Sequence, residues 1–368
     1  MNFISTFKEG QEGRNFGLPT GIPDLDKSLD GMQRKTTYTV ASSPKVGKST
    51  LVDFCFVLNP YLYSLENPDL DIDWNYYSFE IDRVQKEFKF AAFFMDYDYQ
   101  IDSIEHNGQW FMMSPRYLLG RLKDEEGNII PVSKEHAELL KEIYSNRIVP
   151  LFGRYSQNGS KLQDGKINFI EEKTNPTGVR NDLLAYADRN GEFFKEPYHT
   201  KNEKGEDVVK ERIIGYKPKN PNKFTINILD HVRLLKRERN FTMKDNIDKM
   251  SQYEVELRNW CGHTFVNVIH LNRGLAAVDR LRFSGAHIYP TAEDIKDSGN
   301  LSEDSDVVMT LFNPSDDKYN LKEHFGNPIT PEYRSIHIVE SRATISPDHI
   351  FVNMYGNVNK FTPLVINF

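Results

Sequence analysis

The spacing of apolar residues separates expected strands from expected helices along the chain. Continuous apolar and β-branched runs predict buried strands over residues 36–41, 74–79, 224–230, 264–270, 307–312 and 335–340. Apolar residues at helical spacing predict helices over residues 22–29, 51–58, 133–144 and 247–260. Strands that alternate with helices are typical of an α/β fold.

The rest of the chain carries weaker patterns. Residues 1–17 are interrupted by glycine and lack periodicity, as expected of an arm that docks on a neighbour or of a frayed end. Residues 81–223 show the helix at 133–144, hairpin-like turns at 124–128 and 188–191, and then a polar stretch at 201–223 typical of a long exposed excursion. We therefore expect an arm at 1–17 and one domain at 18–368. In that domain 81–223 is an enlarged helical and hairpin insertion, and a β-hairpin lies near the C-terminal end.

The composition is that of an ordinary globular protein. Of the 368 residues, 39% are hydrophobic, which is enough for a sizeable core. The net charge of −7 confines any binding of nucleic acid to a local basic stripe. Cys55 and Cys261 have apolar neighbours and are expected to be buried thiols, and no apolar run reaches the roughly 18 residues of a membrane helix. We expect a cytoplasmic protein without a membrane span.

A phosphate-binding loop is expected where the strand at 36–41 meets the following helix. The segment Gly47-Lys48-Ser49 completes the pattern G-x-x-x-x-G-K-[ST], with Ser42 in the usual place of the first glycine. Serine suits this place if the backbone there does not need a positive φ. Lys48 would contact the β- and γ-phosphates of ATP, and the Ser49 hydroxyl would hold Mg²⁺. The residues expected to bind the nucleotide are Ser43, Pro44, Lys45, Val46, Gly47, Lys48, Ser49 and Thr50.

Two acidic residues follow expected strands. The carboxyl ends of strands in an open α/β sheet form the edge where ligands bind. Glu80, after the strand at 74–79, is therefore a candidate base for the water that attacks the γ-phosphate, although a glutamate here is also typical of a helix N-terminus. Asp230, at the end of the strand at 224–230, would bind Mg²⁺ together with Ser49, or would cap the next helix.

Two basic segments are candidates for contact with single-stranded DNA. One follows Asp230, and the other is the long loop at 274–290, where basic, aromatic and glycine residues suit a nucleic-acid backbone. Both compositions also suit a solvated surface or a disordered loop. The candidate residues are Arg233, Lys236, Arg237, Arg239, Arg280, Arg282 and Phe283.

Four stretches resemble, in order, the ATPase domain of DnaB-like replicative helicases. They are the segment T-G-I-P-D-L-D at 20–26, the phosphate loop, the L-D at 229–230 with the basic segment after it, and a final pair of motifs. That pair is H-L-N-R at 270–273, which resembles the family's Q-L-N-R, and D-I-K-D-S-G-N-L-S-E-D-S-D-V-V at 294–308. The resemblance covers about residues 18–80 and 224–362.

The resemblance implies a RecA-like, mostly parallel sheet flanked by helices, and it assigns roles to single residues. Glu80 becomes the catalytic base and Asp230 the second acid at the metal, beside Lys48 on the phosphates. Arg342 matches the arginine finger that reaches the γ-phosphate bound to the neighbouring subunit. His270 stands where the family has a glutamine that senses the γ-phosphate, so coupling to the nucleotide can differ. Glu340 replaces the lysine of the family's K-x-R.

Three functions remain open on the sequence. The first is an ATP-hydrolysing helicase or translocase that forms a ring, of six copies by the resemblance, on single-stranded DNA in replication, with a primase or loader as a further partner. The short chain also suggests a phage or mobile-element protein. The second is a recombination or loader ATPase that does not unwind DNA, and the third is a nucleotide-binding structural or assembly protein with little turnover.

Overall fold

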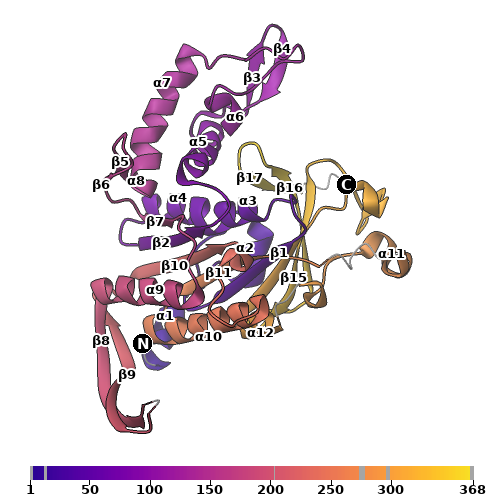
Figure 1. Cartoon of the computed structure of the whole chain (residues 1–368). Helices are drawn as coiled ribbons and strands as arrows, with labels where there is room; N and C mark the ends of the chain where they lie inside the picture. Colours follow the sequence, from indigo (N-terminus) through magenta and orange to yellow (C-terminus); the bar gives the residue numbers. More distant parts are fainter. Residues whose placement is uncertain (1–2, 12–14, 203, 273–277, 296–298, 365–368) are drawn as a thin grey trace.

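A nine-stranded sheet forms the centre of the described residues in the computed structural model, which describes 3–11, 15–202, 204–272, 278–295 and 299–364 (Figure 1). The strand order is β17-β16-β15-β12-β1-β11-β10-β2-β7. The strands from β12 to β7 are parallel, and β15, β16 and β17 add antiparallel to the β12 edge. Their bounds are β1 Thr37–Ser42, β2 Asp71–Ser78, β7 Ile167–Ile170, β10 Lys223–Asp230, β11 Thr264–His270, β12 Val307–Phe312, β15 Tyr333–Ser341, β16 Asp348–Tyr355 and β17 Lys360–Pro363. The mostly parallel α/β fold expected from the sequence is confirmed.

Helices cover both faces of this sheet, and each face has its own apolar core. Helices α2, α3, α4 and α5 contribute to one core, and α9, α10 and α12 to the other. The fully apolar runs expected from the sequence are therefore the strands that are buried on both faces. The bounds are α2 Pro23–Leu29, α3 Lys48–Asp53, α4 Asn59–Glu66, α5 Arg83–Tyr99, α9 Pro176–Asn190, α10 Met243–Cys261 and α12 Gly299–Asp304, and a π-helical turn at Phe54–Leu58 joins α3 to α4.

The middle of the chain forms two projections and one strand of the sheet. A lobe on one side carries α5, α6, α7 and the β3–β4 hairpin, and a long β8–β9 hairpin projects on another side (Figure 1). Between them β7 pairs in parallel with β2, so the segment 81–223 also supplies an edge strand. The bounds are α6 Pro115–Leu118, α7 Lys134–Ile143, α8 Val149–Phe152, β3 Ser103–His106, β4 Gln109–Met112, β5 Arg154–Tyr155, β6 Lys161–Gln163, β8 Gly191–Lys201 and β9 Asp207–Pro218, with a π-helical turn at Tyr144–Ile148.

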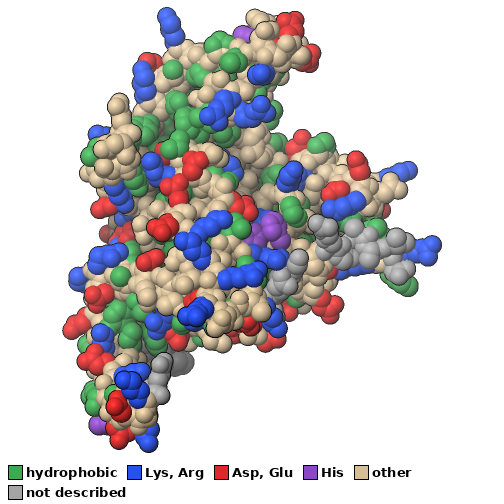
Figure 2. All heavy atoms as spheres, in the orientation of Figure 1, with side chains coloured by type: hydrophobic (Ala, Val, Ile, Leu, Met, Phe, Trp, Pro, Cys, Tyr) green, Lys and Arg blue, Asp and Glu red, His purple; other side chains and the backbone are tan. Residues whose placement is uncertain are grey.

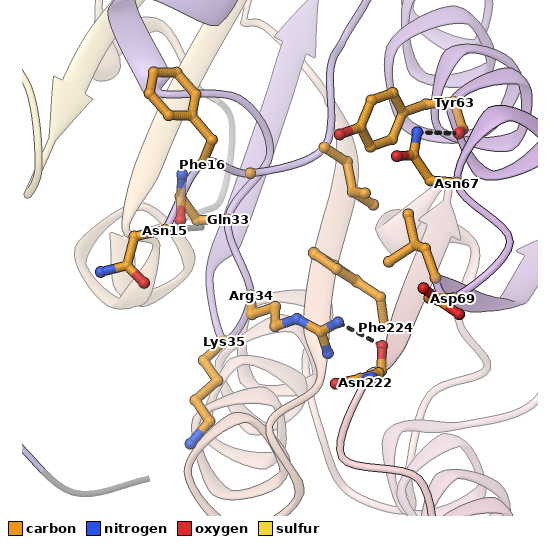
Figure 3. Close-up of a pocket in the computed structure, with 13 residues that line it drawn as sticks. Asn15, Phe16, Gln33, Arg34, Lys35, Tyr63, Asn67, Asp69, Asn222 and Phe224 are labelled. Atoms are coloured by element: carbon orange, nitrogen blue, oxygen red, sulfur yellow. Dashed lines mark hydrogen bonds between the residues drawn. The ribbon is translucent and has the colours of Figure 1, made fainter. Parts of the chain in front are cut away.

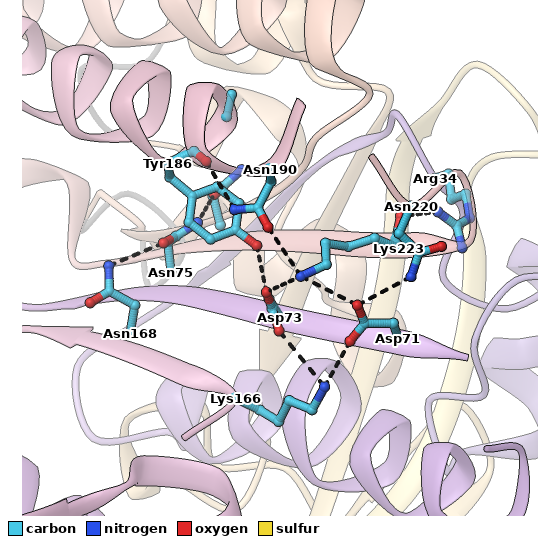
Figure 4. Close-up of polar contacts among 12 residues, drawn as sticks. Arg34, Asp71, Asp73, Asn75, Lys166, Asn168, Tyr186, Asn190, Asn220 and Lys223 are labelled. Carbon is cyan, nitrogen blue, oxygen red and sulfur yellow. Dashed lines mark hydrogen bonds and ion pairs between the residues drawn. The ribbon is translucent and has the colours of Figure 1, made fainter. Parts of the chain in front are cut away.

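Ion pairs fasten the starts of β2, β7 and β10 together (Figure 4). Lys223 lies 2.6 Å from Asp73, and Lys166 lies 2.7 Å from Asp71. Tyr186 of α9 donates a hydrogen bond of 2.7 Å to Asp73. Opposite charges paired across neighbouring strands favour this register. These contacts lie at the amino-terminal edge of the parallel strands, away from the phosphate loop.

Several expectations are wrong in detail. The turn expected at 188–191 is the end of α9, because Asn190 bonds back to the Tyr186 carbonyl at 2.9 Å and β8 starts at Gly191. Residues 3–11 of the expected arm form helix α1 (Phe3–Gln11), with Ile4 and Phe7 exposed. The loop at 274–290 contains α11 (Val278–Ser284), and the basic segment after Asp230 forms a 3₁₀ turn at Val232–Leu234 and then irregular backbone, without the helix of the family.

The remaining elements agree with the sequence more closely. Helix α7 starts after Ser133, whose side chain accepts from the His136 N–H, as expected for the helix at 133–144. Cys55 is buried, whereas Cys261 is only half-buried. None of the described helices is long and apolar enough to cross a membrane. Two short strands, β13 Glu323–His324 and β14 Asn327–Pro328, complete the list.

Candidate nucleotide-binding site

The expected phosphate loop joins β1 to α3 at the carboxyl edge of the sheet. Ser42 is the last residue of β1 and does not have a positive φ, so the missing glycine costs nothing there. Gly47 does need to be glycine, because its φ is 115° and a Cβ would collide with the Met354 sulfur. Residues 43–47 form the loop, and Lys48, Ser49 and Thr50 form the first turn of a helix that continues to Glu66. Backbone N–H groups at such a helix start suit an anion.

Lys48 points to the neighbouring strand β11. Its Nζ lies 3.0 Å from Nδ1 of His270, the last residue of β11. Burial lowers the pKa of Lys48, and the nearby carboxylates of Asp230 and Glu80 oppose this shift. Burial and the charge of Lys48 lower the pKa of His270, so a neutral imidazole accepts the hydrogen bond from the ammonium group. The structure therefore brings Lys48 and His270 together, as expected for a group that senses what Lys48 binds.

Ser49 and Asp230 also meet, across the boundary between α3 and β10. The Ser49 hydroxyl donates to Asp230 Oδ1 at 3.2 Å, and Asp230 is only 2% exposed. A hydroxyl and a carboxylate are the oxygen ligands that Mg²⁺ prefers, so these residues fit that ion. No group of three or more His, Cys, Asp or Glu residues suited to a metal occurs in the described part of the chain. Nucleotide oxygens and water would therefore have to complete the coordination.

The structural explanations for the two acids do not hold. Asp82, rather than Glu80, caps α5, because the Asp82 side chain accepts from the Gln85 N–H at 2.8 Å. Glu80 is exposed between β2 and α5, near enough to Lys48 to act on its pKa. Asp230 caps no helix, since the 3₁₀ turn after it is capped by the side chain of His231. Both carboxylates are therefore left for other tasks at the loop.

Three side chains at the site were missed from the sequence. Arg334 of β15 is buried and donates to the Val46 carbonyl at 3.3 Å, which supports the phosphate loop from below. His231 is buried with its ring centroid 4.2 Å from that of His270. Tyr76 of β2 reaches Asp230 from within the core at 3.4 Å. An arginine and a tyrosine in otherwise apolar strands are the only signals that the sequence offered.

Arg342 lies at the opposite edge of the sheet from the loop of its own chain. It follows β15, and its guanidinium lies 3.3 Å from Asp306, which accepts from the N–H of Thr37 at the start of β1. The phosphate loop follows the other end of β1, five residues later, which is about 16 Å along a strand. Arg342 is 55% exposed in its side chain. It therefore cannot serve the loop of its own chain without rearrangement of the sheet.

The candidate DNA-binding residues divide into exposed and engaged groups. Lys236, Arg237, Arg239, Arg282 and Phe283 are exposed, and Phe283 is 91% exposed. Arg280 instead pairs with Asp294 and donates to the Tyr289 carbonyl. Arg233 is half-buried and acts on the pKa of His231 and His270, so it belongs to the phosphate site. Figure 2 shows Lys and Arg side chains gathered in the middle of one face, beside histidine. Arg273 and residues 296–298 of the resembling motifs lie outside the described residues.

A hollow of about 760 Å³ lies away from all these groups (Figure 3). Its lining residues precede the parallel strands: Arg34 comes before β1, Leu70 before β2 and Asn222 before β10. Ligands of open α/β sheets bind at the other edge, after the strands. Arg34 already donates to the Asn222 carbonyl at 2.6 Å, so we do not assign the nucleotide to this hollow.

Comparison with known proteins places the fold. No protein-family model and no curated protein matches the sequence. Among solved structures, an ATPase domain of the DnaB-like helicase type is 14% identical with a TM-score of 0.63, and the match covers 98% of this chain and 97% of that chain. A second structure, of a DnaB-like replicative helicase studied for its interactions with primase, is 15% identical with a TM-score of 0.63, over 98% of this chain and 67% of that chain. The chain therefore has the RecA-like fold of the ATPase domains of DnaB-like replicative helicases, including its middle segment.

Proposed function

We propose that the chain is an ATPase that binds ATP and Mg²⁺ at the 43–50 loop and hydrolyses ATP between two copies of itself. The observation that carries this proposal is the distribution of the candidate groups. Lys48, Ser49, Asp230 and His270 meet at one edge of the sheet, with Glu80 nearby, whereas Arg342 lies at the other edge. A cation that completes the site must then come from a neighbour.

In this proposal the residues have separate tasks. Lys48 holds the β- and γ-phosphates, and Ser49 and Asp230 hold Mg²⁺, which would neutralise charge on the phosphates. Glu80 orients the attacking water and takes its proton, and Arg342 of the next copy stabilises the transition state. His270, bonded to Lys48, is placed to respond when the γ-phosphate leaves. Groups that are pre-positioned in this way stabilise charge that develops during the reaction.

We further propose that the copies form a ring, of six by resemblance, that moves on single-stranded DNA in the cytoplasm during replication as a helicase or translocase. The support is the fold it shares with helicase ATPase domains and the exposed cations near the site. A primase or loader would be a further partner.

ATP turnover measured against protein concentration, with and without single-stranded DNA, tests this proposal. Turnover that rises steeply with concentration and is stimulated by DNA supports an active site between copies and a nucleic-acid motor. The Lys48→Ala protein is the control for contaminating ATPases. Turnover with strand exchange but no unwinding would favour a recombination or loader ATPase. ATP binding without turnover would favour a structural nucleotide-binding protein.

The salt dependence of DNA binding tests the candidate contacts. Lys236, Arg237, Arg239 and Arg282 are exposed, and four neutralised phosphates on a single strand give a slope of about −3 for log affinity against log salt. Replacing the first three residues by alanine should bring the slope to about −1, since each contact contributes about −0.7. Titration of a labelled oligonucleotide at several salt concentrations measures both slopes. A wild-type slope near zero would remove these residues from DNA binding.

A further inference from the structure

Three fully buried polar side chains form a closed network directly behind Asp230. They are Asp53 at the end of α3, Tyr76 in β2 and Lys86 in the first turns of α5, and none of the three has more than 0% exposure. Lys86 Nζ lies 3.0 and 2.9 Å from the two Asp53 oxygens and 2.8 Å from the Tyr76 hydroxyl. All three donors of the ammonium group are thus satisfied. Such a pair is costly to bury and is often no more stable than apolar residues of similar volume, so stability alone does not explain it.

The Tyr76 hydroxyl connects this network to the candidate metal site. It accepts from Lys86, so its single hydrogen has two acceptors, Asp53 Oδ1 at 2.8 Å and Asp230 Oδ2 at 3.4 Å. Tyr76 and Asp230 project from the same face of the sheet, because Tyr76 is paired with Ile228 and Ser78 with Asp230. The other oxygen of Asp230, Oδ1, faces the Ser49 hydroxyl. The carboxylate is therefore held with one oxygen toward the core and the other toward the loop.

The network also joins the three segments that carry the site. Asp53 lies on the helix that follows the phosphate loop, Tyr76 lies four residues before Glu80, and Lys86 lies six residues after it. A shift of α5 would move Lys86 and, with it, the hydroxyl that contacts Asp230. Residues that hydrogen-bond to a metal ligand from behind orient it and tune its affinity for the metal.

We infer that Tyr76, held in place by the Asp53–Lys86 ion pair, is a positioning residue that presents Asp230 to Mg²⁺. This inference rests on the proposed function, because it assumes that Asp230 holds the metal of a bound nucleotide. Tyr76 touches neither the nucleotide nor the reacting atoms in this scheme and acts through Asp230.

Binding of a fluorescent, non-hydrolysable ATP analogue over a range of Mg²⁺ concentrations tests the inference without turnover. The Tyr76→Phe protein should need about 10-fold more Mg²⁺ for half-maximal binding, as expected for the loss of a group behind a metal ligand. Binding of the analogue in EDTA should equal that of the wild type. The matched control is Tyr186→Phe, which removes a tyrosine–aspartate hydrogen bond at the opposite edge of the sheet and should leave the Mg²⁺ requirement unchanged (Figure 4).

The outcomes separate this inference from the proposed function. An unchanged Mg²⁺ requirement in Tyr76→Phe, or an equal shift in Tyr186→Phe, overturns the inference and leaves the function standing. Wild-type protein that binds the analogue with no dependence on Mg²⁺ overturns both. If Tyr76→Phe fails to fold because Lys86 has lost an acceptor, the apolar triple variant Asp53→Leu, Tyr76→Phe, Lys86→Met replaces it. That variant leaves no buried charge, and the same shift is expected and the same unchanged requirement overturns the inference.

Discussion

Replacement of Arg342 by alanine should lower ATP turnover by about 10³- to 10⁵-fold, the range that such arginines contribute in phosphoryl transfer. Nucleotide binding to the loop should persist, because Arg342 lies at the far end of β1 from the loop of its own chain. Turnover is measured by phosphate release at a protein concentration that saturates assembly.

Mixing two inactive proteins tests whether Arg342 acts on a neighbour. Arg342→Ala protein retains Lys48, and Lys48→Ala protein retains Arg342, so a mixed assembly contains some interfaces with both groups. Activity should return in the mixture. The control mixes Lys48→Ala with Glu80→Gln, whose defects lie on the same side of the interface, so no interface is intact and no activity should return. Mixed assemblies that form but stay inactive in the first mixture would contradict an intersubunit site.

The parts of the fold that were predictable are those whose residues carry a local pattern. The buried strands at 224–230 and 264–270 are unbroken apolar runs, because helices cover both faces of a parallel sheet. Helix α10 has a periodic apolar face and a capping box at Thr242. Strand β7 has four residues and lies at the sheet edge, so its sequence carries little signal, and its place depends on pairing with β2. The misread turn at 188–191 is composed of residues equally suited to a helix end.

The candidate site follows the same rule. Lys48, Ser49, Asp230 and His270 were predictable because each ends or follows a strand at the ligand edge, and the structure brings them together. Tyr76 was not, because its role depends on a contact between strands that are distant in sequence. The contrast between Arg233 and Lys236, one beside the phosphate site and one exposed, arises from irregular backbone that no period describes.

Replacement of Glu80 by glutamine should stop hydrolysis while leaving nucleotide binding intact. Glutamine has the same shape but cannot accept the proton of water, and a general base contributes about 10²- to 10⁴-fold to the rate. Glu80 is exposed and caps no helix, so the fold should not change. Single-turnover phosphate release and equilibrium binding of labelled ATP measure the two effects separately.

The matched control is Asp82→Asn, two residues further along the same loop. Asp82 accepts from the Gln85 N–H, so its loss should weaken the start of α5 by about 0.5–2 kcal/mol and leave turnover largely unchanged. The reverse result, with hydrolysis kept in Glu80→Gln and lost in Asp82→Asn, would transfer the role of base to Asp82. Hydrolysis kept in both proteins would remove this loop from the chemistry, and the water would then have to be activated from the side of His270 or Asp230, whose side chains are the other acceptors at the phosphate edge.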